Sequence, residues 1–163
     1  MHGDFGLNAY NSKTLSALAE MGVSRQTLSF EARLAQIRDM RGPLETDLIV
    51  YGRLPCMITE QCIIRNSAGR CNCTVPNNLA DRRWGAVSRC CRRFGHRNQI
   101  FNAHKLYLAD KHEDYETAGL WGVRLMFTTE TPHECVAVTQ SYQGLTDYRP
   151  NGLTRGLYYR GVE

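Results

Sequence analysis

The sequence has no apolar run that approaches the roughly 20 residues needed to span a bilayer. It also lacks the usual marks of secretion, because Met1 is followed by His2-Gly3-Asp4 and not by a basic stretch and an apolar segment. The motifs G-x-S-x-G, H-E-x-x-H, P-loop and G-x-G-x-x-G are missing. A composition of 42% hydrophobic and 22% charged residues excludes collagen and wholesale disorder. We therefore expect a soluble, cytoplasmic protein that does not bind a membrane.

Acidic residues are absent from one arginine-rich stretch. The six arginines of this stretch are Arg82, Arg83, Arg89, Arg92, Arg93 and Arg97. Without them the remaining chain is slightly acidic, since the 20 basic side chains fall to 14 against 16 acidic ones. Such a local positive field suits phosphate binding, charge compensation of a thiolate-bound cluster, or a solvated surface. The sequence leaves these three interpretations open.

Cysteine is distributed just as unevenly. Six of the seven cysteines lie within 36 residues, and these are Cys56, Cys62, Cys71, Cys73, Cys90 and Cys91. An odd number of cysteines in a chain without secretion marks favours thiolate ligands over a disulfide framework. Thiolates bind zinc and iron–sulfur clusters, and both sites commonly take four sulfurs. The spacing matches neither a zinc ribbon nor a ferredoxin, so it predicts a metal or cluster site without choosing iron or zinc.

Hydrophobic periodicity predicts an α/β fold in the first third of the chain. Residues 1–53 follow a β-α-β-α-β pattern, with strands expected at 5–10, 25–29 and 46–51 and a helix in each interval. The strand centres recur every 20 to 22 residues, which is typical of a parallel sheet with short connections.

The rest of the chain divides into two further parts of one domain. Residues 54–97 show little periodicity and hold the cysteines and arginines, which indicates a long functional insertion. Residues 98–163 are expected to contain strands at 105–109 and 122–127, a helix over 132–142 and a glycine-rich tail of ordered turns. About five strands are too few for a closed barrel of eight, so the pattern predicts a small open sheet or half of a barrel.

Several stretches resemble the collagenase-like U32 peptidase family. The sharpest is Tyr51-Gly52-Arg53-Leu54-Pro55 followed by Met57-Ile58-Thr59-Glu60-Gln61-Cys62. The other matching stretches are Gly6-Leu7-Asn8-Ala9-Tyr10-Asn11-Ser12, Thr27-Leu28-Ser29-Phe30-Glu31, Asp81-Arg82-Arg83, Arg97-Asn98-Gln99-Ile100-Phe101-Asn102 and Thr154-Arg155-Gly156-Leu157-Tyr158-Tyr159-Arg160-Gly161-Val162. The resemblance implies a barrel of βα units, a TIM-like barrel of which this chain is the C-terminal half.

The resemblance also implies a cysteine-bound iron–sulfur cluster, of the 4Fe–4S type, near the C-terminal ends of the strands. Its expected ligands in this sequence are Cys62, Cys71, Cys73 and Cys91. The family often has a cysteine just before the Arg-Asn pair, where this sequence has His96, so Cys90, Cys56 and His96 are alternatives for the fourth ligand. Arg92 and Arg97 are expected to support the cluster. Zinc is the alternative metal.

The activity implied by the resemblance is that of a peptidase. Glu31, Arg53 and Glu60 are the candidate catalytic residues, because they follow expected strands or lie beside the cluster. Similar proteins serve oxygen-independent hydroxylation of RNA bases or of a quinone precursor, which is the alternative reaction. A non-catalytic module that binds RNA or is stabilised by zinc is a further alternative.

The expected substrate is accordingly a peptide or an RNA. Half of a barrel leaves unpaired sheet edges. We therefore also expect the chain to need a missing N-terminal half, a partner chain or a second copy of itself.

Overall fold

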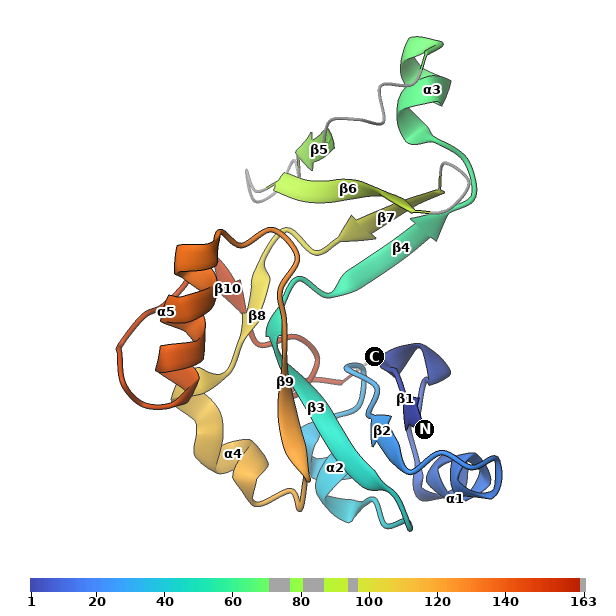
Figure 1. The fold of residues 1–163 in the computed structure, drawn as a ribbon, viewed down its shortest axis with the longest axis vertical. Helices are drawn as coiled ribbons and strands as arrows, with labels where there is room; N and C mark the ends of the chain where they lie inside the picture. Colours follow the sequence, from blue (N-terminus) through green and yellow to red (C-terminus); the bar gives the residue numbers. More distant parts are fainter. Residues whose placement is uncertain (71–76, 81–86, 94–96, 162–163) are drawn as a thin grey trace. The chain divides into compact units, whose positions relative to one another are not determined.

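The computed structural model describes residues 1–70, 77–80, 87–93 and 97–161. They form two compact units (Figure 1). Unit 1 consists of Met1–Gly52 and Leu106–Glu163, and unit 2 consists of Arg53–Lys105. The expected α/β class is confirmed, since parallel strands alternate with helices in unit 1.

Unit 1 is built on a six-stranded mixed sheet. Four strands are parallel, in the order β1 (His2–Gly3), β2 (Arg25–Thr27), β3 (Glu45–Gly52) and β9 (Gly122–Met126). Strand β8 (Lys105–Tyr107) pairs antiparallel with β3, and the two-residue strand β10 (Leu153–Thr154) follows β8 in the sheet order. The remaining elements are η1 (Phe5–Leu7), α1 (Ser12–Glu20), α2 (Leu34–Asp39), η3 (Ala109–Lys111), α4 (His112–Glu116) and α5 (Pro132–Tyr142).

Local sequence signals account for the positions of the longer helices. Asn11 caps α1, where its side chain accepts a hydrogen bond from the Thr14 N–H at 3.0 Å. Thr131 and Glu134 form a reciprocal capping box at the start of α5, with Pro132 in its first turn. Helix α5 has the predicted bounds. Met21, which follows the last residue of α1, is 73% exposed.

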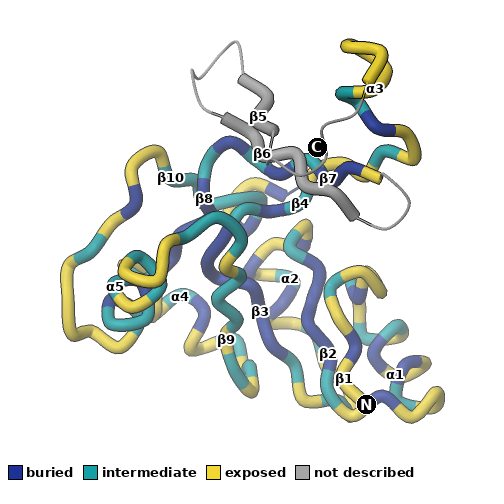
Figure 2. Tube along the Cα trace, turned by 45° about the horizontal axis from the view of Figure 1, so that its top comes forward, coloured by how far each residue is buried: buried dark blue, intermediate teal, exposed yellow. Residues whose placement is uncertain are grey.

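Strand β3 forms the centre of the core. Leu48, Ile49, Val50 and Tyr51 are fully buried, which Figure 2 shows as a continuous dark segment. An uninterrupted apolar strand is typical of a parallel sheet that is covered on both faces. At its end Gly52 has a φ of +127°, and a β-carbon there would lie 2.1 Å from the Met126 carbonyl oxygen. Only glycine therefore allows β3 and β9 to approach this closely.

The C-terminal tail is tied to this core by tyrosine hydroxyls. The Tyr158 hydroxyl donates to the Ile49 carbonyl at 2.6 Å. The Tyr142 hydroxyl donates to the Val50 carbonyl at 2.6 Å and accepts from the Leu108 N–H at 2.9 Å. The expected ordered tail is confirmed, and β10 is an addition that its glycine-rich sequence did not predict.

The first strand differs from the prediction. Strand β1 precedes residues 5–10, and these residues instead contain the turn η1 and an isolated parallel bridge between Ala9 and Leu28. Asp4 causes the break, because its carboxylate accepts from the Phe5 N–H at 2.7 Å and so begins the 3-10 turn. Strands β8 and β9 lie within their predicted ranges and end one or two residues earlier.

Unit 2 contains an antiparallel sheet where irregular chain was expected. Its strands follow the order β4 (Pro55–Thr59), β7 (Arg97–Phe101), β6 (Val87–Arg93) and β5 (Asn77–Ala80). Helix α3 (Ile63–Ala68) follows β4. Hydrophobic periodicity does not reveal these strands, because β4 is largely exposed and β7 buries two polar residues, Asn98 and Gln99. In the ranges that the structure describes, no helix is long and apolar enough to cross a bilayer.

Candidate functional site

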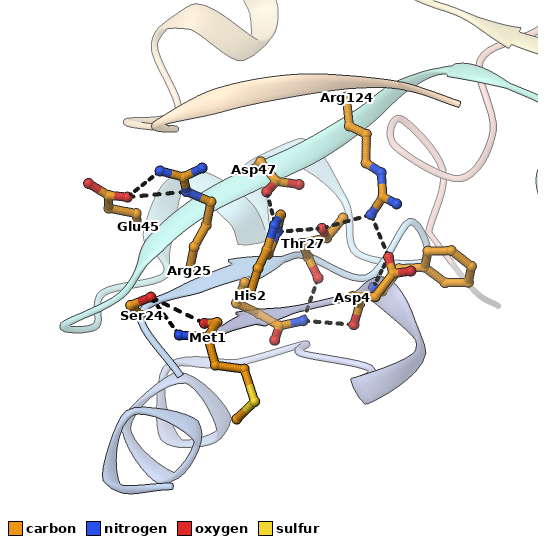
Figure 3. A network of polar contacts seen from close by, with 11 residues as sticks. Met1, His2, Asp4, Ser24, Arg25, Thr27, Glu45, Asp47 and Arg124 are labelled. Carbon is orange, nitrogen blue, oxygen red and sulfur yellow. Dashed lines mark hydrogen bonds and ion pairs between the residues drawn. The ribbon is translucent and has the colours of Figure 1, made fainter. Parts of the chain in front are cut away.

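A row of polar side chains occupies one face of the parallel sheet in unit 1. Thr27 of β2 pairs with Asp47 of β3, and Ile49, two residues further along β3, pairs with Arg124 of β9. Because residues that alternate along a strand share a face, Thr27, Asp47 and Arg124 lie on the same face of the sheet. Figure 3 shows that His2 of β1 joins them, so four strands contribute to one polar cluster.

Asp47 is the buried member of this cluster. The residue is only 5% exposed, and its Oδ2 atom lies 2.9 Å from His2 Nε2 (Figure 3). Its Oδ1 atom is buried without a hydrogen-bond partner among the described residues. A buried carboxylate oxygen without a donor is unfavourable, since nothing replaces the hydration that it has lost. The His2 side chain is 46% exposed and connects this carboxylate with solvent.

Arg124 links the two outer strands of the same face. Its guanidinium NH1 lies 2.5 Å from Asp4 Oδ1 and donates to the Thr27 hydroxyl at 3.2 Å (Figure 3). The Thr27 oxygen also lies 3.3 Å from His2 Nε2. The cluster therefore combines a buried carboxylate, an imidazole, a hydroxyl and a cation within hydrogen-bonding distances of one another.

A second acidic group stands at the C-terminal end of β3. The Tyr51 hydroxyl donates to Glu130 Oε1 at 3.1 Å, and Glu130 Oε2 accepts from the N–H groups of Thr128 and Thr129 at 2.7 and 2.9 Å. Burial and then the Glu130 carboxylate raise the pKa of Tyr51 well above its usual range. Tyr51 is therefore a permanent donor that fixes the turn after β9.

In unit 2 the loop that leads to Cys62 is held from strand β7. The Asn98 side-chain amide donates to the Gln61 carbonyl at 2.9 Å and to the Thr59 hydroxyl at 3.3 Å. Arg97 forms an ion pair with Glu60, with 2.7 Å between Nε and Oε2. Cys62 follows at the N-cap of α3 and is 5% exposed. Two of the predicted site residues, Glu60 and Arg97, are thus in direct contact beside a predicted ligand.

Strand β6 brings two more predicted residues to β7. Cys91 pairs with Gln99 and Arg92 pairs with Asn98, the residue that holds the Cys62 loop. Cys90 pairs with Ile100. The predicted residues Cys71, Cys73 and His96 lie outside the described residues. Within the described ranges, no group of three or more histidine, cysteine or acidic side chains is arranged to hold a metal ion.

The other predicted residues have distinct surroundings. Glu31 is exposed in the turn after β2, where its N–H donates to the Ser29 hydroxyl at 3.4 Å. Arg53 uses its NH1 group to bind the carbonyls of Asn102, at 3.0 Å, and of Ala103. Cys56 is exposed as a residue, yet the atoms packed around its sulfur raise the pKa of the thiol, which disfavours the thiolate that binds metals.

Unit 1 also contains a cavity of about 700 Å³ between α4 and the end of α5. Its lining includes Tyr107, Tyr142, Asp110 and Arg149. Asp110 already forms a bidentate pair with Arg155, at 2.5 and 2.8 Å, and a longer one with Arg149 at 3.5 Å. Its carboxylate therefore anchors the tail, which makes this cavity a weaker candidate than the polar sheet face.

Sequence reasoning missed His2, Thr27, Asp47 and Arg124. Single polar residues inside apolar strands were the available signal, since Asp47 and Arg124 interrupt the runs TDLIVY and GVRLMF. A polar residue at a buried strand position requires a partner. The sequence could not show that the partners come from four different strands.

The family model of peptidase family U32 matches residues 1–155. No curated protein and no solved structure matches the chain. The match covers all of unit 2, unit 1 up to residue 155, the polar face of the sheet and every predicted cysteine ligand. The chain therefore belongs to peptidase family U32.

Proposed function

We propose that the chain is a peptide hydrolase whose unit 2 holds a cysteine-ligated iron–sulfur cluster. Family membership supports a hydrolase. The main support for the cluster is the Cys62 loop. Cys62 is buried, and the residues before it are held by Asn98 and by the Arg97–Glu60 ion pair. A loop held by a hydrogen bond to the Gln61 carbonyl and by the ion pair of Glu60 suits a ligand position, because a preorganised ligand loses little entropy on binding.

The donor set has the chemistry that such a cluster requires. Cys62, Cys71, Cys73 and Cys91 are the proposed ligands, and thiolates are the ligands that iron–sulfur clusters take. The described members of the set fit this role: Cys62 is buried at the end of the clamped loop, and Cys91 lies one strand away from β4 across β7. When bound, the cluster would supply an electron-transfer centre or a Lewis-acidic iron.

Arginines beside these cysteines offset the negative charge of a thiolate site. Arg92 pairs with Asn98 and Arg93 pairs with Arg97, at the end of the sheet where β4 leads into the Cys62 loop. Nearby cations favour the thiolate over the thiol. Arg92 and Arg97 are therefore proposed to support the cluster electrostatically, and the contact with Glu60 orients Arg97.

The three candidate catalytic residues differ in their contacts, and so in their proposed roles. Glu60 is tied to Arg97, and Arg53 is tied to two backbone carbonyls, so both are proposed to position the surrounding chain. Glu31 is exposed in the turn after β2 and is proposed to contact substrate. Catalytic groups of barrel enzymes lie in such turns after strands.

Anaerobic purification with measured iron, zinc and acid-labile sulfide tests the cluster. Wild-type protein is expected to be brown and to contain iron and sulfide, and Cys62→Ser is expected to lose them. Cys135→Ser is the matched control, because Cys135 lies on α5 in unit 1. A colourless protein with one zinc would overturn the iron–sulfur proposal in favour of a structural metal.

Cleavage assays test the hydrolase separately. Gelatin and a labelled peptide library are incubated with cluster-loaded protein and with a chelated sample. Peptide cleavage is expected only in the loaded sample. If no peptide bond is cut above the chelated control, the peptidase proposal fails, and hydroxylation of RNA bases or of a quinone precursor becomes the reaction to assay.

A further inference from the structure

We infer that His2 and Asp47 form a general-base dyad on the polar face of unit 1, with Arg124 and Thr27 beside it, that activates water against a substrate carbonyl. This inference rests on the proposed hydrolase function and assigns the reacting groups that the cysteine loop does not provide. Its geometric basis is the 2.9 Å contact between His2 Nε2 and Asp47 Oδ2 (Figure 3).

The contacts of the imidazole determine which ring nitrogen is the base. A carboxylate only accepts hydrogen bonds, so Nε2 must carry the hydrogen that faces Asp47. The Thr27 oxygen at 3.3 Å is a second acceptor for the same hydrogen, since Thr27 already accepts from Arg124 at 3.2 Å. Nδ1 is then the nitrogen with the lone pair, and it belongs to a side chain that is 46% exposed.

Asp47 is suited to stabilise the protonated ring. It is a buried carboxylate with one oxygen on His2 and one without a partner among the described residues. A positive imidazolium compensates this charge better than a neutral ring does. The other charged groups near His2 are the Met1 ammonium, which donates to the Ser24 hydroxyl, Arg25, its register partner on β2, with Glu45, and Arg124 with Asp4. Each arginine is already paired with a carboxylate, so Asp47 is the acid that remains for His2.

Arg124 reaches the dyad through Thr27. Its NH1 group donates to the Thr27 hydroxyl, whose oxygen lies 3.3 Å from His2 Nε2, so this cation stands on the Nε2 side of the imidazole. Arg124 is therefore a positioning residue that orients Thr27. Thr27 itself is not the nucleophile, because its oxygen faces Nε2, the protonated nitrogen, and is fully buried.

The resulting step is balanced with water as the only co-reactant. His2 Nδ1 takes one proton from water while the water oxygen attacks the carbonyl carbon, and the carbonyl electrons move to the carbonyl oxygen. The imidazolium then returns that proton to the leaving amine or alcohol as the C–N or C–O bond breaks. Asp47 stays ionised throughout and acts as a positioning residue.

Hydrolysis of p-nitrophenyl acetate and of the peptide library by the full chain tests this dyad. His2→Gln is expected to lower both rates at least about 100-fold, the usual contribution of a general base. His133→Gln is the matched control, because His133 is exposed on α5. Circular dichroism verifies that each variant is folded.

The two substrates separate failure of the dyad from failure of the proposed function. If His2→Gln still cleaves peptides at the wild-type rate, the dyad is wrong and the hydrolase stands. If the wild type hydrolyses the ester in a His2-dependent way but cuts no peptide, the dyad stands and the peptidase is wrong. Ester hydrolysis that is absent or independent of His2 overturns the dyad.

A spectroscopic measurement decides the role of Asp47 independently of activity. Nitrogen-15 NMR of the imidazole is expected to show the Nε2–H tautomer of His2 in the wild type. Asp47→Asn is expected to lose this preference, because an amide donates as well as accepts. A wild-type ring that carries its proton on Nδ1 would overturn the inference even if the variants failed to fold.

Discussion

The guanidinium of Arg124 lies 2.5 Å from the carboxylate of Asp4, although 120 residues separate them in the sequence. Arg124 is on β9 and Asp4 follows β1, which are the outer two of four parallel strands. In a flat sheet these strands would be about 14 Å apart, at roughly 4.8 Å per strand. The extended arginine and aspartate side chains together span this distance across the polar face of the sheet. The register of the four strands places His2, Thr27, Asp47 and Arg124 on this face.

Asp4→Asn tests how much this ion pair contributes to stability. The two side chains are 37% and 57% exposed, and pairs at such exposure contribute at most about 1 kcal/mol. We expect the free energy of unfolding, measured with urea, to fall by less than about 1 kcal/mol, and by less still at high salt. Asparagine keeps the oxygen that accepts from the Phe5 N–H. The exposed Asp39→Asn is the control. A much larger loss would show that the pair stabilises the fold more than an exposed ion pair normally does.

Asn98→Ala tests the clamp on the Cys62 loop. Asn98 is 5% exposed and donates to both Gln61 and Thr59, so its removal leaves a carbonyl without its donor, at a cost of about 1 to 3 kcal/mol. We expect Cys62 in metal-free protein to react about tenfold faster with a thiol reagent, because local opening becomes easier. Peptide mass spectrometry identifies the labelled cysteine.

The control for this clamp is Asn66→Ala. Asn66 donates to the Gln61 side chain at 2.9 Å and is exposed, so its removal should leave the labelling of Cys62 nearly unchanged. Equal rates of labelling in the two asparagine variants would contradict the assigned role of Asn98.

The sequence predicted correctly those helices and strands whose local sequence signals agree with their burial in the fold. The bounds of α5 follow from the Thr131–Glu134 capping box and Pro132, which are local. Strand β3 follows from its short, β-branched apolar run, which is typical of a buried strand. Unit 2 was misjudged because Asn98 and Gln99 are buried polar residues, and their positions depend on partners in β4 and β6 that periodicity does not contain.

The candidate site was only partly predictable for the same reason. The contact of Glu60 with Arg97 joins two residues that were both singled out from the sequence, because each lies next to a conspicuous motif. Asp47 and His2 have no motif around them, and their pairing depends on strand order and register. Such long-range geometry is set by the fold and leaves no spacing rule in the sequence.

Asp110→Asn tests the anchor of the C-terminal tail through the pH dependence of stability. The hydrogen bonds from Arg155 lower the pKa of Asp110 below its ordinary value. The folded state therefore holds its proton less tightly than the unfolded state does, and the stabilisation is present above about pH 4. It is lost as the pH falls through the lower, native pKa.

For Asp110→Asn we expect the free energy of unfolding to be about 1 kcal/mol lower at neutral pH. We also expect stability to fall less steeply as the pH is lowered, that is, a flatter acid limb, measured by thermal unfolding between about pH 2 and 5. Asp147→Asn, in the lining of the same cavity, should keep the wild-type acid limb. An acid limb that does not change in Asp110→Asn would mean that Arg155 does not stabilise the ionised carboxyl.

Tyr158→Phe tests the buried attachment of the tail to β3. The Tyr158 side chain is 1% exposed, and its hydroxyl donates to the Ile49 carbonyl at 2.6 Å. Burial raises the pKa of this phenol far above its ordinary value near 10. Because the folded state favours the neutral phenol, the stabilisation is complete below about pH 10 and is lost as the pH rises further.

The phenylalanine variant removes the hydrogen bond and the titrating group together. We expect the free energy of unfolding to fall by about 1 kcal/mol at neutral pH and to decline less steeply above about pH 10 than in the wild type. Tyr148→Phe is the control, because Tyr148 contributes its backbone carbonyl to Tyr107 and Ser141. If Tyr158→Phe and the wild type lose stability in parallel at alkaline pH, the tail is held by packing alone and the buried hydroxyl contributes nothing to its attachment.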